Sequence, residues 1–418
     1  MRTRTGSIGL RTISAAFAML LQAWICAPAL AEPLASATAA TLAGDQYRTS
    51  FQLELSAGVT AEIYTLANPY RVIVDLPDVQ FRLPDGTGQD GRGLVRTFRY
   101  GLFAEGKGRV VLDTTGPVRI ERAAMTAAPQ GESIVFSFDI VTTDPASFGL
   151  GTGSGKAAAE NAPKAPPPVE PPTNAPKQSG KPVIMIDPGH GGIDAGAIST
   201  SNLFEKDVVL AVAKELGRQL AAAGRYDVRM TRASDVFISL DQRLNLSMTH
   251  GVDLFISLHA DSLAEQNVAQ TIRGATIYTL SERASDEQAR RMAEKENASD
   301  LLAGLNAADG QGDDEVKSIL FDLMKRETAN FSSDFSNVLV RKLKSATTLS
   351  RAPQRAAAFK VLKQTHAPSV LIELGYLSNP EDEKLLNSPA WHKQIAASIT
   401  AAIDTYFAKR RTAGSPRP

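Results

Sequence analysis

The chain has 418 residues, of which 43% are hydrophobic, so it can form two ordinary domains and is not disordered throughout. Its 45 Lys and Arg residues equal its 45 Asp and Glu residues. No overall charge excess would draw it to nucleic acid or to an anionic membrane surface, so we expect neither as a partner without a local charged patch.

The first 31 residues have the pattern of an export signal. Arg2, Arg4 and Arg11 precede an apolar run over 13–25, and small residues follow at 29–31. A retained membrane anchor is the alternative, but the run is short for a span of about 20 residues. We predict cleavage after residue 31, export to the periplasm by the Sec route, and no stable membrane span afterwards.

Residues 42–145 are predicted to form a small all-β sandwich, in which Gly, Pro and Asp separate the strands. Two segments share a phrase, Arg71–Asp75 (RVIVD) and Arg109–Asp113 (RVVLD), which indicates either a weak internal duplication or β preference alone. The region contains no histidine, so we expect a binding or targeting role. The predicted strands are Ser50–Leu55, Tyr70–Leu76, Arg109–Leu112 and Ile134–Ile140.

A Pro-rich linker over 149–181 leads to a second domain over 181–410, in which strands alternate with helices. This order predicts an α/β domain with a largely parallel sheet flanked by helices. Helices are predicted at Lys206–Ala223 and, with an interruption near 328–330, from about 314 to 343. The predicted strands are Val183–Ile186, Tyr226–Met230, Leu254–Leu258, Ala275–Leu280 and Ser369–Leu374.

Three of these strands end near a residue that can bind a metal or move a proton: His190, His259 and Glu373. Sites gather at the carboxyl ends of strands in such sheets, and Glu205 follows His190 after a loop that could fold back there. A catalytic zinc site needs protein ligands and a nearby base. Two imidazoles and one carboxylate can supply the ligands, and a second, free carboxylate can act as the base. The single cysteine, Cys26, lies in the export signal, so it cannot be a ligand in the mature chain.

The residues alone leave other interpretations open. A single histidine at a strand end is more often a surface or packed residue than a ligand, and Asp-Pro-Gly is an ordinary turn sequence. If the site does bind zinc, then Asp187 or Asp194 could accept a hydrogen bond from a ligand histidine. Spacing does not decide between these two aspartates.

Four ordered motifs resemble those of the zinc-dependent N-acetylmuramoyl-L-alanine amidases that cut bacterial peptidoglycan, and the match covers most of 181–408. The resemblance implies one Zn²⁺ bound by His190, Glu205 and His259, with Glu373 as the general base. Residues 42–145 more weakly resemble the AMIN module that accompanies periplasmic members and is thought to bring them to the cell wall. The motifs are Asp187–Ala197 (DPGHGGIDAGA), Glu205-Lys206, Ser257–Asp261 (SLHAD) and Glu373–Asn379 (ELGYLSN).

The reaction implied is hydrolysis of the amide that joins the lactyl group of N-acetylmuramic acid to the L-alanine of the stem peptide. The resemblance implies a role in wall remodelling and daughter-cell separation, with peptidoglycan as substrate. A zinc peptidase acting on stem peptides is the alternative within the same class. A wall-binding protein with a degenerate site is the alternative from another class.

A polar stretch over about 282–313 is longer than a connection needs, and such loops are often functional lids. Septal members of the family carry an insert here that blocks the cleft until an activator binds. The resemblance thus implies autoinhibition, relieved by a protein activator of the LytM/EnvC type. Glu296 is the candidate inhibitory ligand of zinc and Glu294 the second choice; the alternative is a solvated helix with ordinary surface carboxylates.

Overall fold

The computed structural model describes residues 35–149 except 129, 130 and 132, then 180–262, 272–305, 319–364 and 366–412. The side chains of 319–325 and 412 are not described. The predicted export signal, most of the predicted linker and the end of the polar stretch lie outside these residues. None of the described helices is long and apolar enough to cross a membrane.

The N-terminal region is a β-sandwich, as the sequence predicts, followed by the short 3-10 helix η1 (Pro145–Ser147). One sheet has the strand order β5-β1-β2-β9-β8 and the other β3-β4-β7-β6. The strands of the first sheet are β1 (Ala35–Gly44), β2 (Arg48–Leu55), β5 (Val79–Phe81), β8 (Val118–Ala127) and β9 (Ile134–Thr142). Those of the second are β3 (Glu62–Leu66), β4 (Arg71–Pro77), β6 (Val95–Ala104) and β7 (Lys107–Thr114).

Alternate side chains of the two sheets form one buried core. Phe51 and Phe138 from the first sheet and Val74 and Leu112 from the second belong to the same cluster. Because successive side chains of a strand point to opposite faces, the residues between them face away from this core. The second sheet therefore has an outer face, which includes Ile73.

The second region is built on a six-stranded sheet of order β11-β10-β12-β15-β13-β14. Most neighbouring pairs are parallel, and the exception is β13 against β15. This is the predicted α/β architecture. The strands are β10 (Val183–Pro188), β11 (Asp227–Met230), β12 (Leu254–His259), β13 (Ala275–Leu280), β14 (Leu349–Ala357) and β15 (Ser369–Glu373).

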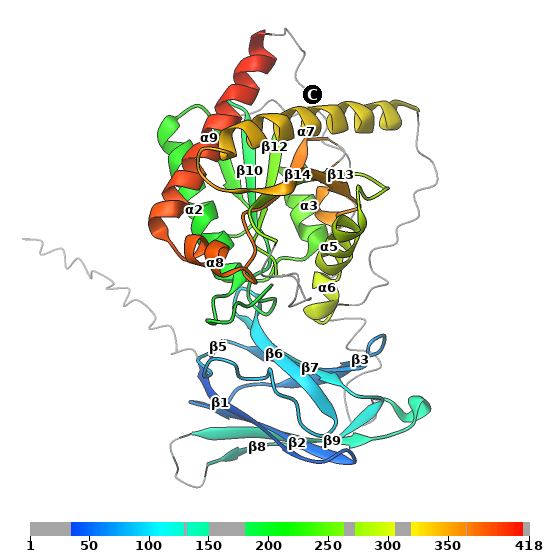
Figure 1. Ribbon diagram of the computed structural model, residues 1–418. Helices are drawn as coiled ribbons and strands as arrows, with labels where there is room; N and C mark the ends of the chain where they lie inside the picture. The colour runs from blue at the N-terminus through cyan, green and yellow to red at the C-terminus, as the bar shows by residue number, and fades with distance from the viewer. Residues whose placement is uncertain are drawn as a thin grey trace, which may run out of the picture. The chain divides into compact units, whose positions relative to one another are not determined.

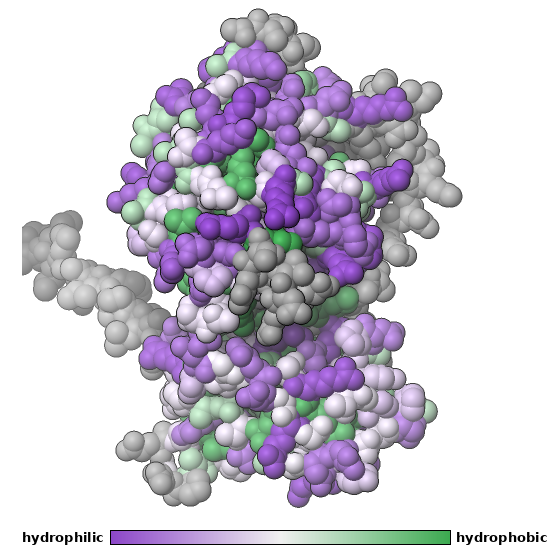
Figure 2. All heavy atoms as spheres, in the orientation of Figure 1, coloured by the Kyte–Doolittle hydropathy of each residue, from purple (hydrophilic) through white to green (hydrophobic). Residues whose placement is uncertain are grey.

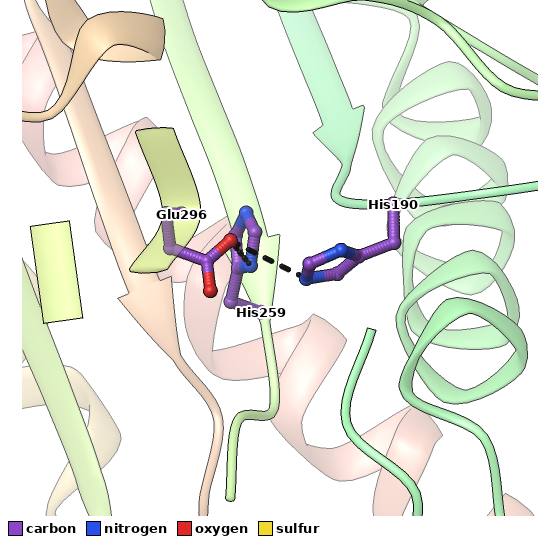
Figure 3. A group of neighbouring side chains, drawn as sticks. All are labelled: His190, His259 and Glu296. Carbon is purple, nitrogen blue, oxygen red and sulfur yellow. Dashed lines mark ion pairs between the residues drawn. The ribbon is translucent and has the colours of Figure 1, made fainter. Parts of the chain in front are cut away.

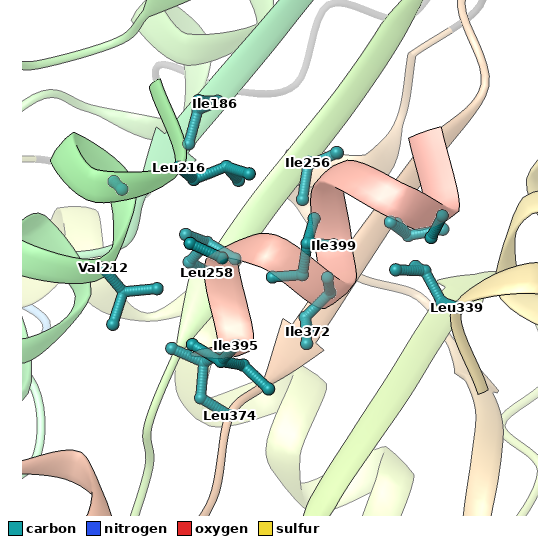
Figure 4. Packing of buried hydrophobic residues seen from close by; sticks show 14 of the residues in the cluster. Ile186, Val212, Leu216, Ile256, Leu258, Leu339, Ile372, Leu374, Ile395 and Ile399 are labelled. Carbon is teal, nitrogen blue, oxygen red and sulfur yellow. The ribbon is translucent and has the colours of Figure 1, made fainter. Parts of the chain in front are cut away.

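Helices cover both faces of this sheet (Figure 1). Side chains such as Ile256 and Ile372 pack with α9 residues such as Ile399 on one face (Figure 4). Phe255 and Leu371 each precede one of these isoleucines in their strands. They therefore pack on the other face, with α3 and α5. The helices are α2 (Glu205–Ala223), α3 (Leu240–Thr249), α5 (Glu287–Asn297), α6 (Ser299–Leu302), α7 (Ile319–Leu343), α8 (Pro380–Leu386) and α9 (Pro389–Thr412), with the 3-10 helix η3 (Lys360–Leu362).

The structure differs from the sequence prediction in one helix. Helix α7 runs without a break from Ile319 to Leu343, so the interruption expected near 328–330 is wrong. Phe335 and Leu339 are completely buried against the sheet, and this packing continues the helix. On the face shown in Figure 2, hydrophilic residues predominate and apolar ones form smaller patches between them.

Candidate metal centre

Two imidazoles meet at the carboxyl end of the six-stranded sheet. His259 is the last residue of β12, and His190 follows β10 in a loop where it has a φ of 55°. The centroids of the two rings lie 4.9 Å apart. Both residues are buried: His190 is 7% exposed and His259 is 5% exposed. Nε2 of His190 and Nδ1 of His259 have no hydrogen-bond partner among the described residues.

Glu205, the first residue of α2, places a completely buried carboxylate between the two rings. Its Oε1 lies 3.2 Å from Nε2 of His190 and 3.2 Å from Nδ1 of His259. The backbone N–H groups of Ala197 and Ala260 each donate to one of its two oxygens at 2.8 Å. The loop after His190 therefore folds back to this end of the sheet.

The fourth side chain comes from the predicted insert. Glu296, near the end of α5, points at both histidines (Figure 3). Its Oε2 lies 3.3 Å from Nε2 of His190 and 3.2 Å from Nδ1 of His259. Glu294, the second choice from the sequence, instead pairs with Arg290 in solvent.

The distances between the imidazole nitrogens and the two carboxylates are those of neighbouring ligands on one small cation. Neighbouring ligand atoms at zinc bond lengths lie about 3.3 Å apart, and the four nitrogen-to-oxygen distances are 3.2 to 3.3 Å. The two unpaired imidazole nitrogens and a carboxylate oxygen of Glu296 all lie within 4.8 Å of one another. The donor set and its spacing therefore fit zinc.

The charge of the centre also fits a divalent cation. Four carboxylates here are at most 5% exposed: those of Glu205, Asp261, Glu296 and Glu373. The ammonium group of Lys295 forms an ion pair with Asp261. Such an excess of buried negative charge is costly unless a cation neutralises part of it. Burial, together with the nearby carboxylates of Glu205 and Asp261, raises the pKa of Glu296.

Glu373 is the last residue of β15, and strand pairing places it directly beside His259. Its Oε2 accepts a hydrogen bond from the backbone N–H of Asp261 at 3.0 Å, whereas its Oε1 has no partner among the described residues. Burial and the nearby carboxylates of Asp261 and Glu205 raise the pKa of Glu373 well above its ordinary value. A raised pKa suits a group that accepts and then returns a proton near neutral pH.

Comparison with known proteins agrees with this arrangement. A family model described as N-acetylmuramoyl-L-alanine amidase matches residues 184–405, and the AMIN domain model matches residues 41–138. The chain is 40% identical to the N-acetylmuramoyl-L-alanine amidase AmiA of Escherichia coli over 234 residues, which cover 56% of this chain and 78% of that protein.

A second relative is similar over nearly its whole length. The N-acetylmuramoyl-L-alanine amidase AmiC of Neisseria meningitidis is 30% identical over 400 residues, which cover 90% of this chain and 93% of that protein. The chain belongs to the N-acetylmuramoyl-L-alanine amidase family. It is a peptidoglycan amidase with an N-terminal AMIN domain.

Supporting groups hold the histidine loop of this amidase in place. Asp194 is the aspartate that contacts a ring: its Oδ2 lies 2.9 Å from Nδ1 of His190, which leaves Nε2 of that ring for the centre. Asp187 instead accepts hydrogen bonds from Thr231 and Ser257 and pairs with Arg243.

Two buried arginines, which the sequence reasoning did not identify, hold the same loop. Nη1 of Arg243 donates to the carbonyl of Pro188, and its Nη2 donates to the carbonyl of His190. Nη2 of Arg232 donates to the carbonyl of Gly189 at 2.7 Å. Both arginines stand among polar residues in the sequence, so no local signal marks them as buried.

Removing one of these groups should destabilise the amidase. In Arg243→Ala, Asp187 would stay buried without its charged partner, so we expect the free energy of unfolding in urea to fall by about 3–5 kcal/mol. Arg218→Ala removes an exposed partner of Glu215 and should change the free energy of unfolding much less. Equal losses in the two variants would contradict a structural role for the buried pair.

Two glycines make room for the side chains of the centre. A β carbon at Gly189 would lie 2.5 Å from the ring of His259. One at Gly196, where φ is +67°, would lie 2.7 Å from Oε2 of Glu205 and 2.7 Å from Cδ2 of His190. The glycines of the DPGHGGIDAGA motif are therefore required partly by close approach to the centre.

Proposed function

We propose that the chain is a periplasmic, zinc-dependent amidase that cuts the bond between the lactyl group of N-acetylmuramic acid and L-alanine during wall remodelling and daughter-cell separation. The observation that carries this proposal is a pair of buried imidazole nitrogens, each 3.2 to 3.3 Å from carboxylate oxygens of Glu205 and Glu296, in a chain of the amidase family. His190, Glu205 and His259 would hold the zinc. The regions 42–145 and 181–410 would act as the wall-targeting and catalytic domains.

Zinc bound there would polarise the scissile carbonyl and lower the pKa of water. Glu373 would take a proton from the attacking water, because its Oε1 is free of other described partners and its pKa is raised. The hydrogen bond from the backbone of Asp261 fixes the other oxygen, so the carboxyl group keeps one orientation. The same group would then deliver the proton to the leaving amine.

In the resting state, Glu296 would occupy the position that substrate and water need. The insert also forms a wall of the small cavity beside the histidines, through Glu296, Asn297 and Ser299. Neighbouring Lys295 pairs with Asp261, whose backbone donates to Glu373. A protein activator would have to move this segment away before peptidoglycan could reach the metal.

Mass analysis of digested peptidoglycan tests the bond that is cut. The amidase should release intact stem peptides from glycan strands that keep their lactyl groups. Shortened stem peptides that remain attached to glycan would instead indicate a zinc carboxypeptidase. Because the resting site would be blocked, the assay should use Glu296→Ala beside the unaltered chain.

Asp194→Ala should weaken zinc binding about 10- to 100-fold, because the ring of His190 would lose the contact that orients it. Competition with a chelator of known affinity measures this change. Asp227→Ala, which removes an aspartate paired with Arg229 on β11, is the control and should leave zinc affinity unchanged. If the two variants bind zinc equally well, Asp194 does not support a metal ligand.

The proposed metal requirement has a direct test against a site that has lost its zinc. Zinc content of the purified chain is the measurement, because a zinc-dependent amidase should carry about one zinc ion per chain. Substoichiometric zinc that cannot be restored by dialysis against the metal would favour the degenerate site.

A further inference from the structure

The two similar segments of the β-sandwich lie side by side. Arg71–Asp75 in β4 and Arg109–Asp113 in β7 pair antiparallel, so each arginine is opposite the aspartate of the other segment and Ile73 is opposite Val111. Their alternate aliphatic side chains belong to the sandwich core. The remaining side chains form an outer surface with two arginines and two aspartates around an apolar centre, which we call the twin-strand face.

The C-terminal end of α6 lies on this face. The last carbonyl groups of a helix have no partner within the helix and need donors from elsewhere. Here three consecutive carbonyls each accept a hydrogen bond from a different arginine of the β-sandwich. The bonds run from Nη1 of Arg71 to Leu301, from Nε of Arg99 to Leu302 at 2.9 Å, and from Nη1 of Arg109 to Ala303 at 3.1 Å.

Apolar contacts join the same two elements. Ile73, Val111 and Ala303 are completely buried and belong to one cluster. The chain approaches so closely at Gly304 that a β carbon there would lie 2.8 Å from Cδ1 of Ile73 and 3.3 Å from Cγ2 of Val111. The helix end is therefore packed on the face as well as hydrogen-bonded to it.

The charges of the face suit a helix end. A helix carries partial negative charge at its C-terminus, where cations are favoured. Arg109 donates two hydrogen bonds to Asp75, at 2.6 and 2.9 Å, from its Nε and Nη2. Its third nitrogen, Nη1, is thereby directed at the carbonyl of Ala303. Arg99 is held by one hydrogen bond, from its Nη2 to Asp113 at 2.6 Å. The aspartates thus orient the arginines, which reduces the entropy lost when α6 binds.

This contact lies close to the metal centre along the chain. Glu296 precedes Leu301 by five residues, which corresponds to about 7.5 Å in a helix. We infer that the twin-strand face is an intramolecular docking surface for the end of α6, and that this contact holds Glu296 on the histidines. The inference rests on the proposed restraint by Glu296. It gives the AMIN region a part in control of the catalytic centre, beyond wall targeting.

Other contacts also hold the segment, so the face supplies one part of the restraint. Nδ2 of Asn297 donates to the carbonyl of Ala358 at 2.9 Å, and the backbone N–H of Lys360 donates to Oδ1 of Asn297 at 2.6 Å. Asp300 accepts from the backbone N–H of Leu240 at 3.0 Å. Loss of the face should therefore raise the population of the open segment without releasing it completely.

Arg99→Ala in the full-length chain tests the inference, because the Arg99 side chain is partly exposed and its loss should leave the sandwich folded. We expect basal release of labelled peptidoglycan to rise about fivefold and amide hydrogen exchange over 287–302 to speed up by a similar factor. Arg96→Ala, on the same strand, is the matched control, because Arg96 is exposed and bonds to Thr115 within the sandwich. The control should change neither measurement.

The combination with Glu296→Ala separates the two proposals. The double variant Arg99→Ala/Glu296→Ala should be no more active than Glu296→Ala alone, since no blocking carboxylate is left to release. If Glu296→Ala activates the enzyme while Arg99→Ala leaves activity and exchange as in the control, the docking inference is wrong and the restraint stands. If Glu296→Ala itself has no effect, the proposed restraint is wrong. Gly304→Val, which should push α6 off Ile73, provides a second variant with the same expected results.

Discussion

Glu373→Ala should retain zinc and lose activity by about 10²- to 10⁴-fold, the contribution expected of a positioned general acid–base group. The Glu373 side chain contacts the backbone of Asp261 and is not a member of the cluster of His190, His259 and Glu296, so the metal ligands should stay in place. The measurement is the rate of peptidoglycan digestion, in the Glu296→Ala background if basal activity is low, with zinc content determined on the same sample.

The matched control for this prediction is Glu381→Ala, an exposed glutamate in the first turn of α8. It should digest peptidoglycan at the rate of the unaltered chain. Near-normal digestion by Glu373→Ala would remove Glu373 from the mechanism. Loss of zinc together with activity would instead give it a structural part in the metal centre.

Glu296→Ala should increase basal activity about tenfold or more, because it removes the carboxylate that lies on both histidines. His190, Glu205 and His259 would remain to hold the metal, so zinc content should not fall. The activated variant should also respond less to an added activator, since the step that the activator promotes is already complete. Initial rates of dye release from labelled peptidoglycan measure the effect.

Glu294→Ala is the control in the same helix. Glu294 lies two residues away and pairs with Arg290, and 61% of its side chain is exposed, so its removal should leave the basal rate unchanged. Equal rates for the Glu294 and Glu296 variants would mean that the insert does not restrain the enzyme through the metal centre.

Much of this site could be predicted because strand ends in an α/β sheet converge. His259 and Glu373 lie at the ends of β12 and β15, and the register of these paired strands places the two residues opposite each other. Periodicity gave the α/β class and most strands of the sheet. Glu205 was a candidate from its place after the His190 loop, whereas Glu296 needed the family resemblance because it lies in a polar helix that looks like ordinary surface.

The rest depends on contacts that no local pattern contains. Arg232 and Arg243 hold the carbonyls of the histidine loop from elements more than 40 residues away. Strand β14 (Leu349–Ala357) was not predicted because it is rich in Arg and Ala, and pairing with β13 determines its conformation. Helix α7 was expected to break where tertiary packing in fact continues it.

The repeated segments show the same limit. Sequence alone left Arg71–Asp75 and Arg109–Asp113 as either a duplication or two similar strands. Their register explains the shared phrase in physical terms, because antiparallel pairing places each arginine opposite an aspartate and the central aliphatic residues opposite each other. The contact of this face with α6 could not have been predicted, since it joins residues about 200 positions apart.

The most direct test of the proposed metal centre is a crystal structure of the full-length chain with anomalous diffraction data collected at the zinc edge. We predict one zinc ion bound by Nε2 of His190, Nδ1 of His259 and Oε1 of Glu205, with Oε2 of Glu296 as the fourth ligand. Zinc with water in the fourth position and Glu296 in solvent would contradict the proposed resting state. No anomalous peak between the two histidines, in crystals grown with zinc, would contradict the metal centre itself.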